Sequence, residues 1–422
     1  MPLGSPRNES RPKQRTKLSG GIVTSNGKWI PRRNRGCVQQ NVSNEPWVRP
    51  ASVPANSSMH RQYNETFDDA TLPPAHTQSL EDAHKLCGVS ASGKRQEPVL
   101  THESQLQPQT RPKLQCSDSA ARVNAAGVTV LIGIHTSPGA GLPRRTAIRE
   151  TWMKWDMFKT LTCFLIGSVG LDRQKRESVE SEAALHGDIK MLPATDGCVL
   201  SIPKCYAWWR AAAAYLQPSG SIQFVGKADD DVFINMPNFH QALSGLSCLP
   251  HVSFGAHAAA GYRPTDFRKC GWSWGGRRAW NSYGCRKHGA YPAFPFALGQ
   301  LQVLSADLVR RLAESPEVQS FVSRADAQID LRKWDKAEDI AFGFLLSRLQ
   351  ADQGLDIHFV SVLGQARNLG CRKNGGLYVN PTNESIAVHF VKKPLGHHYL
   401  WDLFRFRQTH NAKRCMQMAG ID

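Results

Sequence analysis

The sequence has no apolar run long enough to cross a membrane. One of its longest apolar stretches, residues 128–134, has the length and the β-branched content of a strand, whereas a helix that crosses a bilayer needs about 20 apolar residues. This stretch also lies too far from the start of the chain to be a signal peptide. The sequence therefore excludes a multi-span membrane protein, and it shows neither a membrane anchor nor a secretion signal.

Acidic residues are scarce relative to basic ones. The 35 Asp and Glu residues stand against 52 Lys and Arg, so the 422-residue chain has a formal net charge of +17. Such a charge favours an anionic partner. However, the chain has no long block of consecutive like charges, no zinc-finger spacing, no RNA-recognition signature and no basic zipper. We therefore predict that nucleic acid is not a partner.

The eleven cysteines include no CxxC pair. This absence excludes a zinc ribbon and a thioredoxin-like redox site. An oxidising compartment would permit several disulfides and leave at least one cysteine of this odd number outside an intrachain pair. A reduced set of scattered cysteines in a cytosolic protein is the alternative that the sequence leaves open.

Residues 1–120 are polar and show no sustained helix or strand period. This composition predicts a disordered segment. Asn-x-Ser/Thr triplets cluster in it, and they would accept glycans if the chain enters the secretory pathway. Chance occurrence in an Asn- and Ser-rich segment is the alternative. The triplets begin at Asn8, Asn41, Asn56 and Asn64, and one more begins at Asn383 in the remainder of the chain.

Residues 121–422 alternate between short apolar runs and segments with helical spacing. The pattern predicts strands at 128–135, 161–167, 188–192 and 222–227, and helices at 144–155, 173–185 and 206–216. Such alternation is typical of an α/β fold with a mainly parallel sheet and helices on both faces. Ligands of these sheets bind at the carboxyl ends of the strands, so we expect a site in the loop after Lys227.

Three adjacent carboxylates, Asp229, Asp230 and Asp231, follow the fourth predicted strand. Adjacent carboxylates repel one another unless a cation neutralises them. Oxygen ligands suit Mg²⁺, Mn²⁺ or Ca²⁺, and alternate residues of an extended turn can place Asp229 and Asp231 on the same side. A solvated acidic turn before a helix is the alternative.

A second acidic segment contains Glu338 and Asp339. A capping box formed by Asp335 and Glu338 explains these two residues structurally but leaves Asp339 without a role. The positive end of the helix dipole would favour the ionised form of an aspartate in the first turn, which fits a base that must be unprotonated at neutral pH.

Taken together and in this order, several segments resemble the beta-1,3-glycosyltransferase family, which includes beta-1,3-galactosyl- and N-acetylglucosaminyltransferases and the fringe enzymes. The resemblance covers about residues 128–404. It implies a GT-A type nucleotide-diphospho-sugar transferase fold and an inverting, metal-dependent mechanism. The segments are RRTAIRETW at 144–152, FLIG at 164–167, HGDI at 186–189, KADDDVF at 227–233, YPAFPFALG at 291–299 with VLS at 303–305, EDIAFG at 338–343 and VHF at 388–390.

The resemblance also implies roles for individual residues. It assigns the divalent cation, expected to be Mn²⁺, to Asp231 and Asp229 with His389, and it makes Asp339, with Glu338 beside it, the catalytic group. Lys204 resembles a lysine that lies beside the donor in the family, although its surroundings depart from the family pattern. The residues that the resemblance places at the donor are Arg145, Arg149, Lys227, Asp229 and Asp230.

We therefore predict an enzyme that moves galactose or N-acetylglucosamine from UDP-galactose or UDP-N-acetylglucosamine to a glycan acceptor on a glycoprotein or glycolipid, forming a beta-1,3 linkage. One base and a metal cluster favour transfer over hydrolysis, because glycosidases use two carboxylates. Trp272 and Trp274 lie in a loop whose rings could stack on an acceptor sugar or pack the core. The alternative function is a non-catalytic glycan- or nucleic-acid-binding protein on a degenerate transferase scaffold.

The resemblance places the protein in the Golgi lumen or at the Golgi membrane. Family members are anchored there by one N-terminal helix that precedes a flexible stem. In this chain we interpret residues 1–120 as the stem, without a visible anchor, and residues 121–422 as the catalytic domain. An incomplete N-terminus, a soluble enzyme and a partner-tethered enzyme are the three explanations.

Overall fold

A computed structural model describes most of the chain after residue 113 and three short segments before it. The described residues are 21–23, 29–31, 77–88, 114–155, 159–196, 201–263, 268–273, 291–327, 338–369, 381–408 and 411–419. The chain divides into two units, Met1–Glu45 and Pro46–Asp422. In the first unit, β1 (Gly21–Val23) pairs antiparallel with β2 (Trp29–Pro31).

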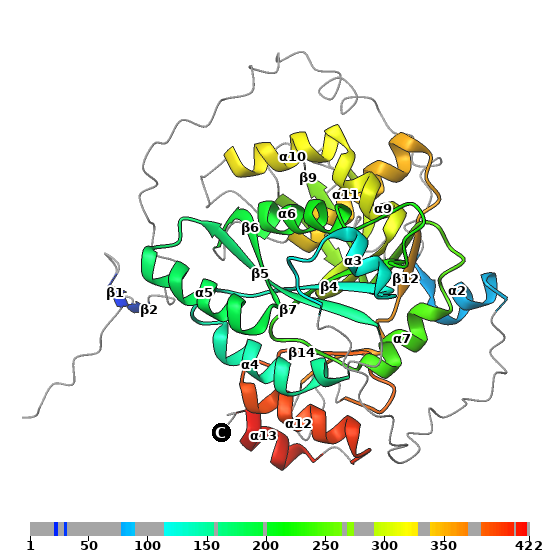
Figure 1. Ribbon diagram of the computed structural model, residues 1–422. Helices are drawn as coiled ribbons and strands as arrows, with labels where there is room; N and C mark the ends of the chain where they lie inside the picture. Colours follow the sequence, from blue (N-terminus) through cyan, green and yellow to red (C-terminus); the bar gives the residue numbers. More distant parts are fainter. Residues whose placement is uncertain are drawn as a thin grey trace, which may run out of the picture. The chain divides into compact units, whose positions relative to one another are not determined.

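The second unit is built on a nine-stranded sheet (Figure 1). Four strands at one side are parallel to one another, and in β4 every residue except the last is buried. Burial on both faces explains why these segments are apolar runs rather than alternating patterns. In sheet order the four strands are β7 (Phe224–Asp229), β4 (Val130–His135), β5 (Thr160–Val169) and β6 (Ile189–Thr195).

One long antiparallel strand, β11 (Tyr291–Ser305), joins the parallel strands to the rest of the sheet. It pairs with β7 on one side and with β9 (Val252–Arg263) on the other. Beyond β9 lie β12 (His358–Ser361) and β3 (Gln78–Ser79), both parallel to their neighbours, while β10 (Arg268–Ser273) pairs antiparallel with β9. The sheet is therefore mixed and mainly parallel, and the predicted α/β fold class is confirmed.

Helices cover both faces of this sheet and enclose a hydrophobic core on each (Figure 1). The first core is lined by α3 (Ala120–Ala125), α6 (Ser201–Ala213), α9 (Ala306–Glu314), α10 (Pro316–Ala327) and α11 (Glu338–Gln353). The second is lined by α2 (Leu80–Leu86), α4 (Leu142–Glu150) with the 3₁₀ turn Trp152–Lys154, α5 (Arg173–His186), α7 (Met236–Ser244), α12 (Pro394–Arg405) and α13 (Ala412–Ala419).

The helix boundaries follow local chemistry. The side chain of Asp172 accepts a hydrogen bond from the Lys175 backbone N–H and caps the start of α5. Gly187 ends the same helix with a φ of 72°, a left-handed conformation that favours glycine. Pro394 opens α12, where its missing N–H costs no helical hydrogen bond. The three helices predicted within residues 144–216 are present with shifted ends.

A small second sheet of three strands places a segment near the C-terminus beside the end of β7. β14 (Ala387–His389) pairs with β13 (Ala366–Asn368) and, antiparallel, with β8 (Phe233–Ile234), which begins two residues after Asp231. His389 is the last residue of β14. This pairing brings a histidine from far along the chain to the end of β7.

Part of the segment interpreted as a stem is folded. The strand β3 extends the large sheet, Ala83 of α2 is fully buried, and a disulfide joins Cys87 to Cys248. The signal for this helix is present in the sequence, since the Ser79 side chain caps it by accepting from the Asp82 backbone N–H. The remaining residues of 1–120 lie mostly outside the described part of the chain, and the domain boundary at 120 stays a prediction.

A second disulfide joins Cys116 to Cys163, and Cys205 is a buried free thiol. The described helices include none with the length and apolar character that a membrane crossing requires.

Candidate active site

Three potential metal ligands meet at the carboxyl end of β7. Asp229 ends this strand, Asp231 follows two residues later, and His389 ends β14. One ligand atom from each side chain lies within 4.8 Å of the others. The arrangement is fixed by the backbone, because the Val391 N–H donates a 2.9 Å hydrogen bond to the Asp231 carbonyl oxygen. The sequence prediction that Asp229 and Asp231 share one side agrees with this geometry.

The donor set fits a divalent cation. Two carboxylates and one imidazole supply oxygen and nitrogen ligands, a combination suited to Mn²⁺. A positive group already lies there, since the Lys392 ammonium contacts Asp231 Oδ2, while His389 Nε2 lies 3.5 Å from Oδ1. Burial works to raise the pKa of Asp231, but these two partners outweigh it and hold that pKa below its usual range. Lys392 was missed at the sequence level, although its position three residues after His389 could have drawn attention to it.

Asp230, the middle aspartate, does not belong to this group of potential ligands. It accepts hydrogen bonds from the Thr136 hydroxyl at 2.7 Å and from the Arg144 guanidinium at 2.8 and 3.1 Å. Its side chain is nearly buried. The structure therefore gives Asp230 a place in holding the loop after β4 against the helix α4, and it separates Asp230 from the grouped metal-ligand candidates Asp229, Asp231 and His389.

The two acidic segments, far apart in sequence, meet at Lys227. Its side chain is 1% exposed, and its ammonium lies 2.5 Å from Glu338 Oε1 and 3.3 Å from Asp229 Oδ1. Gly299 of β11 lies beside all three, because a Cβ at this position would be 3.4 Å from Asp229 Oδ2 and 3.7 Å from Glu338 Oε1. Burial favours the neutral amine, but Asp229 and Glu338 reverse that effect and raise the pKa of Lys227 well above its usual value.

Asp339 lies in the first turn of α11, next to Glu338. Its Oδ1 accepts a 2.8 Å hydrogen bond from the Ile340 backbone N–H. Burial, helped by the charge of Glu338 and opposed by Lys227, raises the pKa of Asp339 to about 6. The expected lowering by the helix dipole is thus outweighed by desolvation. Asp339 still remains mostly ionised at neutral pH, as a general base requires.

Arg145, predicted at the donor, is fully buried and uses every N–H within the protein. Nε and one terminal nitrogen bind the Glu182 carboxylate at 2.9 and 2.5 Å. The terminal nitrogens also donate to the Thr136 hydroxyl and to the carbonyl oxygens of Ser137 and Pro138. Since no donor is left for a ligand, Arg145 fixes the loop that follows β4.

The other basic residues predicted near the donor are also paired. Arg149 binds Asp188 at 2.7 and 2.8 Å and contacts Glu182. Lys204 is buried, and its ammonium lies 2.7 Å from Asp196 Oδ1. It also donates to the Thr136 carbonyl oxygen at 2.7 Å, so it holds the same loop as Arg145.

The predicted acceptor and glycan residues lie largely outside the described residues. Trp272 lies on β10, where only the backbone is described. Trp274 and the asparagines Asn8, Asn41, Asn56 and Asn64 lie outside the described segments. Asn383 is exposed in a turn, and its carbonyl oxygen accepts a 2.7 Å hydrogen bond from Asn238.

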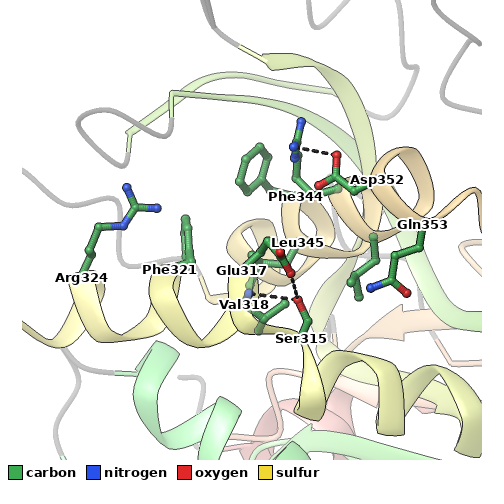
Figure 2. Close-up of a pocket in the computed structure, with 11 residues that line it drawn as sticks. Ser315, Glu317, Val318, Phe321, Arg324, Phe344, Leu345, Asp352 and Gln353 are labelled. Atoms are coloured by element: carbon green, nitrogen blue, oxygen red, sulfur yellow. Dashed lines mark hydrogen bonds and ion pairs between the residues drawn. The ribbon is translucent and has the colours of Figure 1, made fainter. Parts of the chain in front are cut away.

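A pocket of about 120 Å³ lies between α10 and the later turns of α11 (Figure 2). Phe321 and Phe344 contribute apolar surface to it, and Asp352, which is paired with Arg348 at 2.7 Å, lies at its polar side. The metal-ligand candidates and Asp339 are not among the residues that line it. We therefore place the candidate active site at the carboxyl end of β7 rather than in this pocket.

A galactosyltransferase family model matches residues 143–341. The chain is 27% identical over 252 residues to mouse beta-1,3-galactosyltransferase 6, a match that covers 58% of this chain and 67% of that protein. The residues matched by the family model, 143–341, contain the aspartate triplet, Lys227 and Asp339. These findings confirm the resemblance to the beta-1,3-glycosyltransferase family, and they support glycosyl transfer as the class of activity.

Two solved structures resemble the chain distantly. One is the mannosyltransferase PcManGT from Pyrobaculum calidifontis in complex with GDP-Man and Mn²⁺, with 12% identity, a TM-score of 0.29 and coverage of 72% of this chain and 74% of that one. The other is mouse xyloside xylosyltransferase 1 in its apo form, with 12% identity, a TM-score of 0.29 and coverage of 62% and 96%. Because both scores are low, the fold assignment rests on the sheet topology and the family match.

Proposed function

We propose that the protein is an inverting, metal-dependent transferase that moves galactose or N-acetylglucosamine from a UDP-sugar to a hydroxyl of a glycan, forming a beta-1,3 linkage. The observation that supports this proposal most strongly is that carboxylates from the two acidic segments both contact the buried ammonium of Lys227. Lys227 contacts Asp229 of the metal-ligand cluster and Glu338, the residue before Asp339. A cation site and a base are thereby held at the same end of β7.

Asp229, Asp231 and His389 would hold the divalent cation, for which Mn²⁺ fits the donor set. When bound, such a cation acts as a Lewis acid that stabilises the negative charge developing on the departing diphosphate, so no protonating residue is needed.

Asp339 acts as the general base. Its carboxylate takes the proton of the acceptor hydroxyl while the acceptor oxygen forms a bond to the anomeric carbon and the bond from that carbon to the diphosphate oxygen breaks. The electron pair of the broken bond leaves with UDP. Attack from the face opposite UDP inverts the anomeric centre. A carboxylate with a pKa of about 6 is suited to this step, because it is ionised at neutral pH and yet basic enough to accept a proton.

The basic residues near the loop after β4 act in positioning. Arg145 and Lys204 fix this loop through its carbonyl oxygens. Arg144 and Thr136 hold Asp230, which keeps the aspartate turn in place. For Arg145 we therefore replace the predicted donor contact by a positioning role, while Arg149 remains a candidate for the donor site.

The proposed acceptor and compartment are supported by the resemblance to the family. Trp272 and Trp274 are proposed to stack on the acceptor sugar, because aromatic faces bind the apolar faces of sugar rings. The two described disulfides agree with an oxidising compartment. We propose the Golgi lumen or membrane as the site of action and Asn383, which is exposed in a turn, as a glycan acceptor.

A donor screen tests this proposal. Purified protein is incubated with UDP-galactose, UDP-N-acetylglucosamine and other UDP-sugars, with Mn²⁺ added or chelated, and release of UDP is measured with and without glycan acceptors. We expect acceptor-stimulated release from one of the two named donors only with metal present. Absence of release across the panel, with intact binding of glycans, would support the non-catalytic alternative instead.

A further inference from the structure

Lys227 joins three elements at the centre of the candidate active site. Its ammonium is near carboxylates from the end of β7 and from the start of α11, and it lies 3.4 Å from the carbonyl oxygen of Gly299 in β11. With 1% of the side chain exposed, the charge has almost no access to water. A buried ammonium is stable only when it is paired, so these partners hold it in place and it holds them.

The partner on α11 is the first residue of that helix. Glu338 begins α11, its side chain is 15% exposed, and one carboxylate oxygen lies 2.5 Å from the Lys227 ammonium. The residues just before it, 328–337, lie outside the described part of the chain. The Lys227–Glu338 ion pair is therefore a described contact that connects the helix start to β7, one residue away from Asp339.

This pairing is inconsistent with Glu338 as a second base. The Glu338 carboxylate is already engaged by the Lys227 ammonium, which lies 2.5 Å from Oε1 and is almost completely buried. Asp339 has the Ile340 backbone N–H on one of its oxygens, and its raised pKa suits proton transfer. The two adjacent acids therefore have separate roles.

We propose that Lys227 and Glu338 are positioning residues of the transfer reaction, and that their ion pair fixes the first turn of α11, and with it Asp339, relative to the metal-ligand residue Asp229. This inference rests on the proposed function. Reactions of this kind depend on geometry, and a displacement of about 1 Å of a reacting group can lower the rate by about 100-fold. The pair thus connects the metal-ligand residue Asp229 to the base Asp339, and it takes no part in the proton transfer itself.

The variant Glu338→Gln tests the pair, because it removes the charge with little change of shape. Asp352→Asn is its matched control, since Asp352 lies on the same helix, about four turns after Glu338, and is ion-paired with Arg348 at 2.7 Å. Glu338→Asp is a second variant that keeps the charge and shortens the side chain. Each protein is compared by kcat, KM for the donor, Mn²⁺ affinity and amide hydrogen exchange.

We expect Glu338→Gln to lower kcat by about 10- to 100-fold while KM and Mn²⁺ affinity stay within about twofold of the wild type. We also expect faster exchange of the amides of residues 342–345, which donate to carbonyls of the first turn. Glu338→Asp should also lower kcat and speed the exchange of these amides. Asp352→Asn should change neither kcat nor this exchange.

Two results would overturn the inference. One is a kcat of Glu338→Gln within about twofold of the wild type, and the other is exchange at residues 342–345 that is equal in Glu338→Gln and Asp352→Asn. Hydrogen exchange requires no turnover and no metal. If the wild type transferred no sugar, the proposed function would fail, and exchange would still decide whether the pair anchors α11.

Discussion

The acid limb of the pH profile is the property that the environment of Asp339 predicts most sharply. Three charged groups act on this carboxyl: Glu338 and Asp229 raise its pKa and Lys227 lowers it, while burial is the largest cause of the increase to about 6. An ordinary carboxyl, with a pKa near 4, is about 90% ionised at pH 5, whereas Asp339 is about 90% ionised at pH 7 and about 10% ionised at pH 5. The base is thus lost as the pH falls below about 6.

We therefore expect kcat to fall by about tenfold between pH 7 and pH 5 and to level off above pH 7. The assay is UDP release at saturating donor and acceptor. A bound cation adds positive charge near Asp229 and moves the limb towards lower pH, so the metal is kept saturating at every pH and its binding is measured in parallel. Asp339→Asn should lower kcat by about 100- to 10,000-fold and remove the limb.

A wild-type kcat that stays constant down to pH 5 while metal binding is intact would show that Asp339 is not the base. If Asp339→Asn kept measurable activity and its kcat fell with pH at the same midpoint as in the wild type, the titrating group would be a residue other than Asp339.

Three further predictions concern metal binding and stability. Asp231→Asn should weaken Mn²⁺ binding by at least about tenfold, measured by titration of the metal without substrate, because it removes one of three ligand side chains. Arg145→Met should lower the free energy of unfolding by about 3 kcal/mol in denaturant, since it leaves buried acceptors of Glu182 and the loop after β4 without their partner. Replacing both Cys87 and Cys248 by serine should lower it by about 2 to 5 kcal/mol, because their disulfide closes a loop of 161 residues; equal unfolding curves would contradict either claim.

The parallel half of the sheet could be predicted from the sequence because its strands are buried on both faces. Residues 128–135 and 222–227 are apolar runs bounded by loops, and the observed strands β4 and β7 overlap them closely. The long strand β11 could not be assigned in this way. Its pairing with β7 and β9 depends on contacts between segments far apart in the chain, which no local period encodes.

In the candidate site, too, local patterns could be predicted and contacts between distant segments could not. The alternation of side chains in an extended turn predicted that Asp229 and Asp231 share a side, and the structure places them together with His389. The contacts of Lys227 with Glu338 and of Lys392 with Asp231 join residues more than a hundred positions apart. Sequence spacing does not reveal such pairs, which is why neither Lys392 nor the contact between Lys227 and Glu338 was predicted.

The folded part of the predicted stem illustrates a different limit. Composition over a long window favours disorder for residues 1–120, yet it averages over the short segment that forms β3 and α2. This segment is stabilised by pairing with β12 and by the disulfide to Cys248. The partners in these contacts, β12 and Cys248, lie far along the chain, so the composition of residues 1–120 does not reveal them.

If Asp339 is the single base of an inverting transfer at the end of β7, the anomeric configuration of the product must be opposite to that of the donor. NMR of the product formed from an α-linked UDP-sugar is measured for the wild type and for Asp339→Asn at saturating Mn²⁺. We expect a β-linked product from the wild type. Asp339→Asn should form product at least about 100-fold more slowly, with unchanged metal binding. An α-linked product, or an Asp339→Asn variant as active as the wild type, would contradict the account.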